Sequence, residues 1–243
     1  MQGFLIKMNW STFFTWDELW AWSEVWALLI PLAVFLTRRK QIPGILKPVV
    51  YYILVALVLN FISDFIWRFQ SPRRLDLPEW LHNNLPIYHV HAIIRLLLFA
   101  WFFNRLKEPF IVQIKKYLPY VFLLTVFVIF VIIGPARNFV FAYSSELHAI
   151  EAAVLLFYCL QHYVYMAQAE QVSYPNSRSV EWVVAGLTIY VGINFFIFLF
   201  YATLMSISRS FSILIWDIMH NASYVLLCCF IAKAFYESGK SRN

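Results

Sequence analysis

The chain has 243 residues, of which 62% are hydrophobic, 20% aromatic and 13% charged, and its formal net charge is +6. Soluble domains carry about 45–50% apolar and about 25% charged residues, so this composition excludes a soluble enzyme, a disordered chain and a nucleic-acid-binding module. With six glycines and three cysteines, it also excludes a collagen-like chain and a disulfide scaffold. We therefore expect an all-α, polytopic membrane protein whose first partner is the lipid bilayer.

Long apolar runs divide the chain into membrane spans. A spanning helix needs about 20 mostly apolar residues. The sequence contains seven such runs, which predict a single seven-transmembrane-helix bundle over residues 1–243. Strands are not expected, because the runs lack two-residue alternation and an open sheet would leave backbone groups unpaired in lipid. In chain order the runs cover 19–37, 49–68, 85–104, 117–134, 145–167, 181–203 and 213–235.

The distribution of Lys and Arg predicts the orientation. Of the 19 basic residues, twelve fall on one side of the bundle, six fall on the other, and Arg95 lies inside a span. Because Lys and Arg accumulate on the cytoplasmic side, we expect the N-terminus outside the cell membrane and the C-terminus in the cytoplasm. The Phe- and Trp-rich segment 1–18 is predicted to lie in the outer interface, with Trp216 in an outer aromatic belt, and 236–243 forms a short cytoplasmic tail.

Ionisable side chains are concentrated at one depth of the predicted spans. Such residues are costly inside a bilayer, and their usual explanation is function. Each of seven lies four to eight residues from the outer end of its span, which is a depth of about 6–12 Å. The seven are Glu24, Asp64, His91, His148, Glu151, Asp217 and His220.

Helical spacing places many of these polar residues on shared faces. Tyr88, His91 and Arg95 share one face of the third span, whereas His89 points away from it. Lipid cannot satisfy such faces, so they predict a polar pocket inside the bundle that opens toward the outside. The residues expected to contact a ligand are Glu24, Asn60, Asp64, Tyr88, His91, Arg95, Asn194, Asn221 and Tyr224.

The charge of this pocket indicates what it binds. Four carboxylates and one permanent cation give a net charge of −3 while every His is neutral, and a low-dielectric site cannot keep that charge. The pocket must therefore take up protons or bind a cation. This favours a receptor- or transporter-like protein that binds or senses a proton, a metal ion or a small polar ligand. We expect any signalling output to need a partner protein.

Two short patterns suggest a metal site. His148-x-x-Glu151 and Asp217-x-x-His220 each place an imidazole and a carboxylate on one helix face, as in the metal sites of some four-helix bundles. Together with His91, they supply enough donors for a divalent metal such as zinc. The predicted metal ligands are His91, His148, Glu151, Asp217 and His220.

These patterns leave two alternative functions open. One is an intramembrane metal-dependent hydrolase acting on a lipid-like substrate, with Glu151 or Asp217 as general base and Arg95 holding an anionic headgroup. The other is a scaffold or assembly subunit, in which the polar network only holds the helices together.

Known seven-helix families do not fit the sequence. Rhodopsins carry their retinal on a Lys in the middle of the last span, but Lys233 stands at the cytoplasmic end of this one. The zinc hydrolases related to alkaline ceramidases and adiponectin receptors have a His-x-x-x-His pair in that span, and here Tyr224 follows His220 at that spacing. The sequence therefore indicates no family.

Overall fold

Helices make up nearly all of the described chain. The computed structural model describes residues 16–69, 83–106, 112–133, 144–168 and 177–238. No strand occurs among these residues, which confirms the predicted all-α class. The long helices are α2 (Ser23–Arg38), α3 (Lys47–Phe69), α4 (Leu85–Arg105), α5 (Val112–Phe127), α7 (Ser145–Gln168), α8 (Ser177–Leu199) and α11 (Asn221–Ser238).

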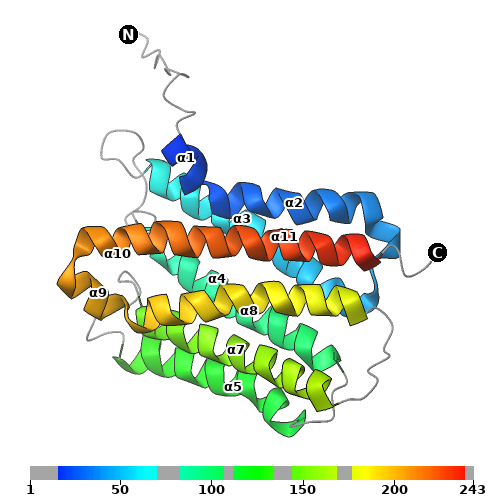
Figure 1. The fold of residues 1–243 in the computed structure, drawn as a ribbon. Helices are drawn as coiled ribbons and strands as arrows, with labels where there is room; N and C mark the ends of the chain where they lie inside the picture. The colour runs from blue at the N-terminus through cyan, green and yellow to red at the C-terminus, as the bar shows by residue number, and fades with distance from the viewer. Residues whose placement is uncertain (1–15, 70–82, 107–111, 134–143, 169–176, 239–243) are drawn as a thin grey trace, which may run out of the picture.

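Short elements connect or extend the long helices. Two of them are π-helical: η5 continues α5, and η6 joins α10 to α11, so the last helix runs without a break from Arg209 to Ser238 (Figure 1). Most of the predicted interfacial segment, 1–15, and the end of the predicted tail, 239–243, lie outside the described residues. The short elements are α1 (Trp16–Ala21), η2 (Arg39–Gln41), η3 (Gly44–Leu46), η5 (Val128–Ile133), α9 (Tyr201–Ile207), α10 (Arg209–Ile215) and η6 (Trp216–His220).

Six helices in the described chain are long and apolar enough to cross a membrane. The predicted count of seven spans is not confirmed, because α2 has 16 residues and is only about 24 Å long. The hydrocarbon core of a bilayer is about 30 Å thick. The six helices cover Gly44–Trp67, Leu85–Arg105, Ile114–Ile132, Ser145–Gln168, Arg178–Leu199 and Arg209–Ser238.

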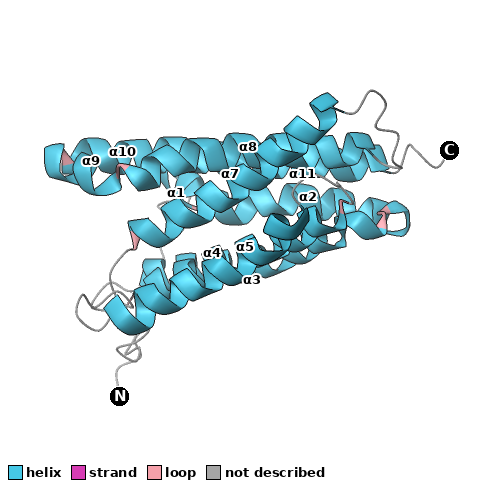
Figure 2. Ribbon diagram, turned by 90° about the horizontal axis from the view of Figure 1, so that it is seen from below, coloured by secondary structure: helices cyan, strands magenta, loops and turns pink. Residues whose placement is uncertain are grey.

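The long helices form a closed ring. Within the described chain, contacts run from α2 to α3, α4, α7, α8 and α11, and back to α2. The helix α5 packs outside this ring, against α4 and α7. Seen from below in Figure 2, α8 and α10 run along one side of the bundle and α3 runs along the other. The ring therefore encloses a central space bordered by six helices.

Local polar contacts fix where several helices begin. The Asn83 side chain accepts a hydrogen bond from the Leu85 amide at 3.0 Å, and the Ser144 hydroxyl accepts one from Leu147 at 3.3 Å. These contacts satisfy amide groups that a helix N-terminus leaves without a partner. Because α4 and α7 begin at defined residues, the polar side chains in their first turns reach the same end of the ring.

The glycine at position 186 allows α8 and α11 to pack closely. A Cβ atom at Gly186 would lie 2.5 Å from the Cβ of Phe230, closer than two such atoms can approach. A Cβ at Gly192, in the same helix, would meet nothing within 4 Å. Small residues at helix interfaces let backbones approach in this way inside membranes.

We predict that Gly186→Val separates α8 from α11 and destabilises the protein by about 1–3 kcal/mol, the usual effect of overpacking. Gly192→Ala is the matched control and should leave the stability nearly unchanged. Thermal unfolding of the purified variants in detergent measures both. Equal melting temperatures for Gly186→Val and the wild type would contradict the described packing of α8 on α11.

Candidate functional site

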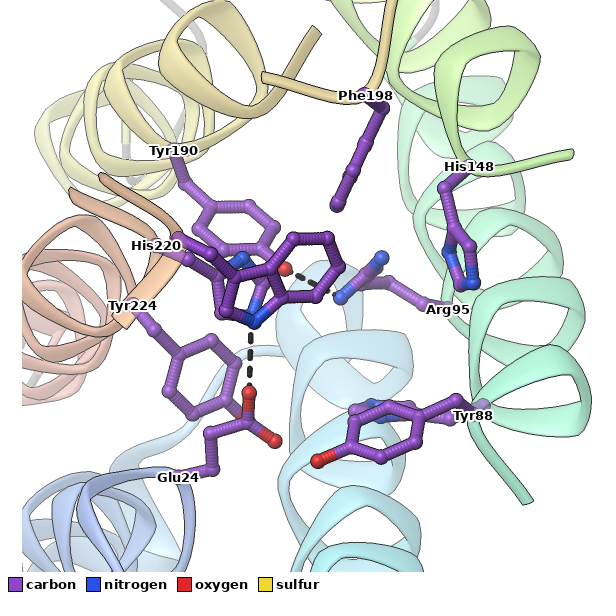
Figure 3. Close-up of a pocket in the computed structure, with 10 residues that line it drawn as sticks. Glu24, Tyr88, Arg95, His148, Tyr190, Phe198, His220 and Tyr224 are labelled. Atoms are coloured by element: carbon purple, nitrogen blue, oxygen red, sulfur yellow. Dashed lines mark hydrogen bonds and ion pairs between the residues drawn. The ribbon is translucent and has the colours of Figure 1, made fainter. Parts of the chain in front are cut away.

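Polar and aromatic side chains line a cavity inside the ring, which we call the central cavity. It lies toward the end of the bundle where α2, α4 and α7 begin and α8 ends (Figure 3). Its atom-free space is about 350 Å³ when open space at the mouth is included, but it has room for only about one or two water molecules. The lining residues are Glu24, Tyr88, His91, Arg95, His148, Tyr190, Phe198, Trp216, His220 and Tyr224.

A buried ion pair crosses the ring beside the cavity. Arg95 on α4 donates to both carboxylate oxygens of Glu151 on α7, from Nε at 2.5 Å and from Nη2 at 2.7 Å. Its Nη1 also donates to the Tyr190 hydroxyl on α8 at 2.5 Å. This two-point geometry is the strongest form of carboxylate–guanidinium contact. Because both Glu151 oxygens face Arg95, this carboxylate cannot act as a general base unless the ion pair opens.

A second polar chain links α2, η6, α8 and α11. Nε2 of His220 lies 2.8 Å from Oε1 of Glu24 (Figure 3). On the other side of the imidazole, Nδ1 of His220 contacts Oδ1 of Asn194. The Asn194 amide nitrogen donates to the Tyr190 carbonyl at 2.7 Å and to the Ser223 hydroxyl at 3.0 Å. The two ring nitrogens of His220 are therefore held between an acidic group and an amide oxygen.

Two further histidines line the cavity from the α4 and α7 sides. Nδ1 of His148 lies 3.7 Å from Oε2 of Glu151. The His91 ring stacks on Tyr52 with centroids 6.1 Å apart, and in the part of the chain that the structure describes its buried Nε2 has no hydrogen-bond partner. Only 4% of His91 is exposed. A buried polar atom without a partner is costly, so Nε2 of His91 marks a position that a ligand or water can satisfy.

Three other predicted ligand contacts do not line the cavity, and two of them, Asn60 and Asn194, hold lining residues from behind. Asn60 donates to the Glu24 carbonyl at 3.1 Å and to the Tyr224 hydroxyl at 3.3 Å, so it positions both residues without lining the cavity. Asn194 likewise holds His220 from outside the lining. Asp64 is not a lining residue either, although it lies close enough to Glu24 for their charges to interact.

The structure does not bring Asp217 and Asn221 to the cavity. Asp217 is exposed, and its carboxylate accepts a hydrogen bond from the Asn221 amide at 3.1 Å. The predicted shared face assumed α-helical spacing, whereas residues 216–220 form a π-helix with a wider turn. The wider turn rotates Asp217 outward relative to His220. Asp217 is therefore not a base or a ligand at this site.

The His89 side chain packs between helices. It is buried, and its ring contacts Phe130 and His148 with centroids 5.2 and 5.7 Å apart. As the sequence predicts, His89 lies off the face of α4 that carries Tyr88, His91 and Arg95. Those three are the described residues of α4 that line the cavity, and His89 is not among the lining residues.

The five predicted metal ligands do not gather into a metal site. In the part of the chain that the structure describes, no three His, Cys, Asp or Glu residues lie close enough to hold a metal ion. Arg95 occupies both oxygens of Glu151, and Asp217 lies outside the cavity. We therefore assign no metal ligands among the described residues.

Three aromatic lining residues were absent from the predicted site. Trp216, predicted to belong to an outer aromatic belt, stacks on His220 with centroids 5.3 Å apart. Phe198 contacts Trp216, His148 and His220 at centroid distances of 5.4, 5.2 and 6.1 Å. Tyr190 and Phe198 lie four residues on either side of Asn194, so helical spacing could have identified them.

The central cavity thus combines one neutralised ion pair, a Glu–His pair, two more imidazoles and an aromatic wall. Such a set can donate and accept hydrogen bonds around a small polar species. The chain matches no family model, no curated protein and no solved structure, so this interpretation depends on geometry alone.

We predict that Glu151→Gln destabilises the protein by about 3–5 kcal/mol, because it leaves the Arg95 guanidinium buried without its counter-charge. Glu146→Gln, at an exposed position in the first turn of the same helix, should change the stability by less than about 0.5 kcal/mol. Thermal or denaturant unfolding in detergent compares the two. A double variant, Arg95→Met with Glu151→Leu, should recover much of the loss. If Glu151→Gln is as stable as Glu146→Gln, the buried ion pair is absent.

Proposed function

We propose that the chain is a seven-helix protein of the cell membrane whose central cavity opens to the outside. In this proposal the cavity binds or senses a small polar ligand, as a receptor or a transporter does. The observation that carries it is the arrangement at His91, a buried imidazole that lines the cavity and has one nitrogen without a hydrogen-bond partner among the described residues. A ligand in the cavity would satisfy that nitrogen.

The position of α2 supports the seventh span. It packs against both α3 and α11, so it completes the ring even though it is short. The helix α1 precedes it with only Trp22 between them, and the two together extend over 23 residues, from Trp16 to Arg38. That length matches a bilayer crossing, which needs about 20 residues.

The distribution of basic residues supports an outward-facing cavity. The cavity lies where α2, α4 and α7 begin, and several Lys and Arg residues lie near the opposite end of the bundle. Because the cytoplasmic side carries the excess of Lys and Arg, the cavity end faces outward. These residues include Arg38, Arg39, Lys40, Lys47, Arg105 and Lys233.

The size and chemistry of the cavity favour a small ligand over a lipid. It accommodates only about one or two water molecules, whereas drug-sized ligands need cavities of about 300–1,000 Å³ that enclose most of their surface. The alternative of a metal-dependent lipid hydrolase also needs a cluster of metal donors, and the described residues contain no such cluster.

We predict that at least one small polar probe raises the melting temperature saturably, and that His91→Leu removes the effect. The probes are ammonium chloride, sodium acetate, glycine and zinc chloride. A ligand at a hundred times its Kd stabilises the folded state by about 2.7 kcal/mol, which thermal unfolding detects easily.

His162→Leu is the matched control, because His162 is buried on α7 but does not line the cavity. It can lower the melting temperature, but it should keep the probe-induced shift. A shift that survives in His91→Leu, or no saturable shift with any probe, would contradict the binding of a small molecule or metal ion in the cavity.

A further inference from the structure

The hydrogen bonds of Asn194 determine where a proton lies on His220. The Asn194 amide nitrogen faces two acceptors, the Tyr190 carbonyl at 2.7 Å and the Ser223 hydroxyl at 3.0 Å. Exchanging the amide oxygen and nitrogen would bring the oxygen against that carbonyl, so the orientation of the amide is fixed. Its oxygen therefore faces Nδ1 of His220, and an oxygen can only accept. Nδ1 must carry a hydrogen.

The contact between Nε2 of His220 and Glu24, on the other side of the imidazole, then needs a second hydrogen. With Nδ1 protonated, a neutral His220 presents a lone pair at Nε2. An ionised Glu24 presents lone pairs as well, and two lone-pair atoms do not approach to 2.8 Å without a proton between them. Either the imidazole or the carboxyl group holds that proton. In both arrangements the pair as a whole is neutral.

The neighbouring charges are compatible with one proton on this pair. Arg95 and Glu151 neutralise each other beside it, and the Asp64 carboxyl group on α3 is a further titratable group close to Glu24. Asp217 on η6 points away from the cavity. The other titratable groups around the pair are Tyr52 on α3, Tyr88 and His91 on α4, His148 on α7, Tyr190 on α8, and Tyr224 and Cys228 on α11.

We propose that Glu24 and His220 bind one proton as a single unit and that this proton is the species to which the central cavity responds. The proposal rests on the proposed function, since it names the ligand of the same site. It also fits the size of the cavity, because a proton carried by water needs no more room than a water molecule.

Loss of the proton breaks a contact between two helices. Deprotonation leaves a carboxylate on α2 facing a lone pair on the last helix, and the two groups repel each other. Asn194 continues to hold Nδ1 of the His220 imidazole, so we expect the Glu24 side chain to move away from His220. Trp216 stacks on the His220 ring and therefore reports the change.

The test is a pH titration of tryptophan fluorescence on the full chain in lipid nanodiscs. We expect a one-proton transition in the wild type, and we expect Trp216→Phe to remove most of its amplitude. The transition should be lost in Glu24→Gln, because a glutamine amide can donate to Nε2 without titrating. It should persist in Glu146→Gln, the exposed control. The melting temperature should fall as the pH rises through the transition, since the folded state loses a stabilising proton.

If Glu24→Gln fails to fold, nitrogen-15 NMR of histidine-labelled wild type gives the same answer, because one imidazole should titrate in step with the fluorescence. A wild type without the transition, or a transition that persists unchanged in Glu24→Gln, would overturn the proposal. If a probe binds in the His91 experiment but the wild type shows no proton transition, only this inference is overturned and the proposed function stands. A proton transition without probe binding would support the proton as the ligand.

Discussion

The ion pair between Arg95 and Glu151 is the interaction on which the polar interior depends. A guanidinium on α4 could not stay buried in an apolar bundle without a counter-charge, and a carboxylate on α7 faces the same difficulty. Their two-point contact neutralises both charges, and the Tyr190 hydroxyl adds α8 to the pair. Three helices of the ring are therefore fixed relative to one another at the depth of the central cavity.

With α4, α7 and α8 fixed in this way, the contact between Glu24 and His220 is the part of the site that can change in our proposal. Their contact joins α2 to the last helix at the point where η6 interrupts α-helical geometry. π-Helical turns occur often at functional sites, because the extra residue changes the direction of nearby side chains. Here the turn directs His220 into the ring and Asp217 out of it. A rigid pair beside a pair that shares a proton is a simple basis for a sensor.

Most of the fold could be predicted from apolar run length, but the site could be predicted only in part. The run 145–167 matches α7 closely, since in lipid a helix must satisfy its own backbone groups. Helical spacing also placed His91 and Arg95 on one face, and both line the cavity. It failed for Asp217, because nothing in the sequence marks the π-helical turn. The pairing of Arg95 with Glu151 joins distant helices, which spacing within one helix cannot reveal.

The central claim is that carboxylates and imidazoles from distant helices meet in one cavity. Solid-state NMR on the chain in lipid vesicles, with carbon-13 at glutamate carboxyls and nitrogen-15 in histidine rings, tests it most directly. We expect dipolar coupling between helices, because Nε2 of His220 on η6 lies 2.8 Å from Glu24 on α2. A weaker coupling within α7 comes from His148 and Glu151, whose Nδ1 and Oε2 lie 3.7 Å apart, and it does not test the contact between helices. Glu24→Gln should remove the stronger coupling. The absence of the Glu24–His220 coupling in the wild type would contradict the meeting of these helices at the cavity.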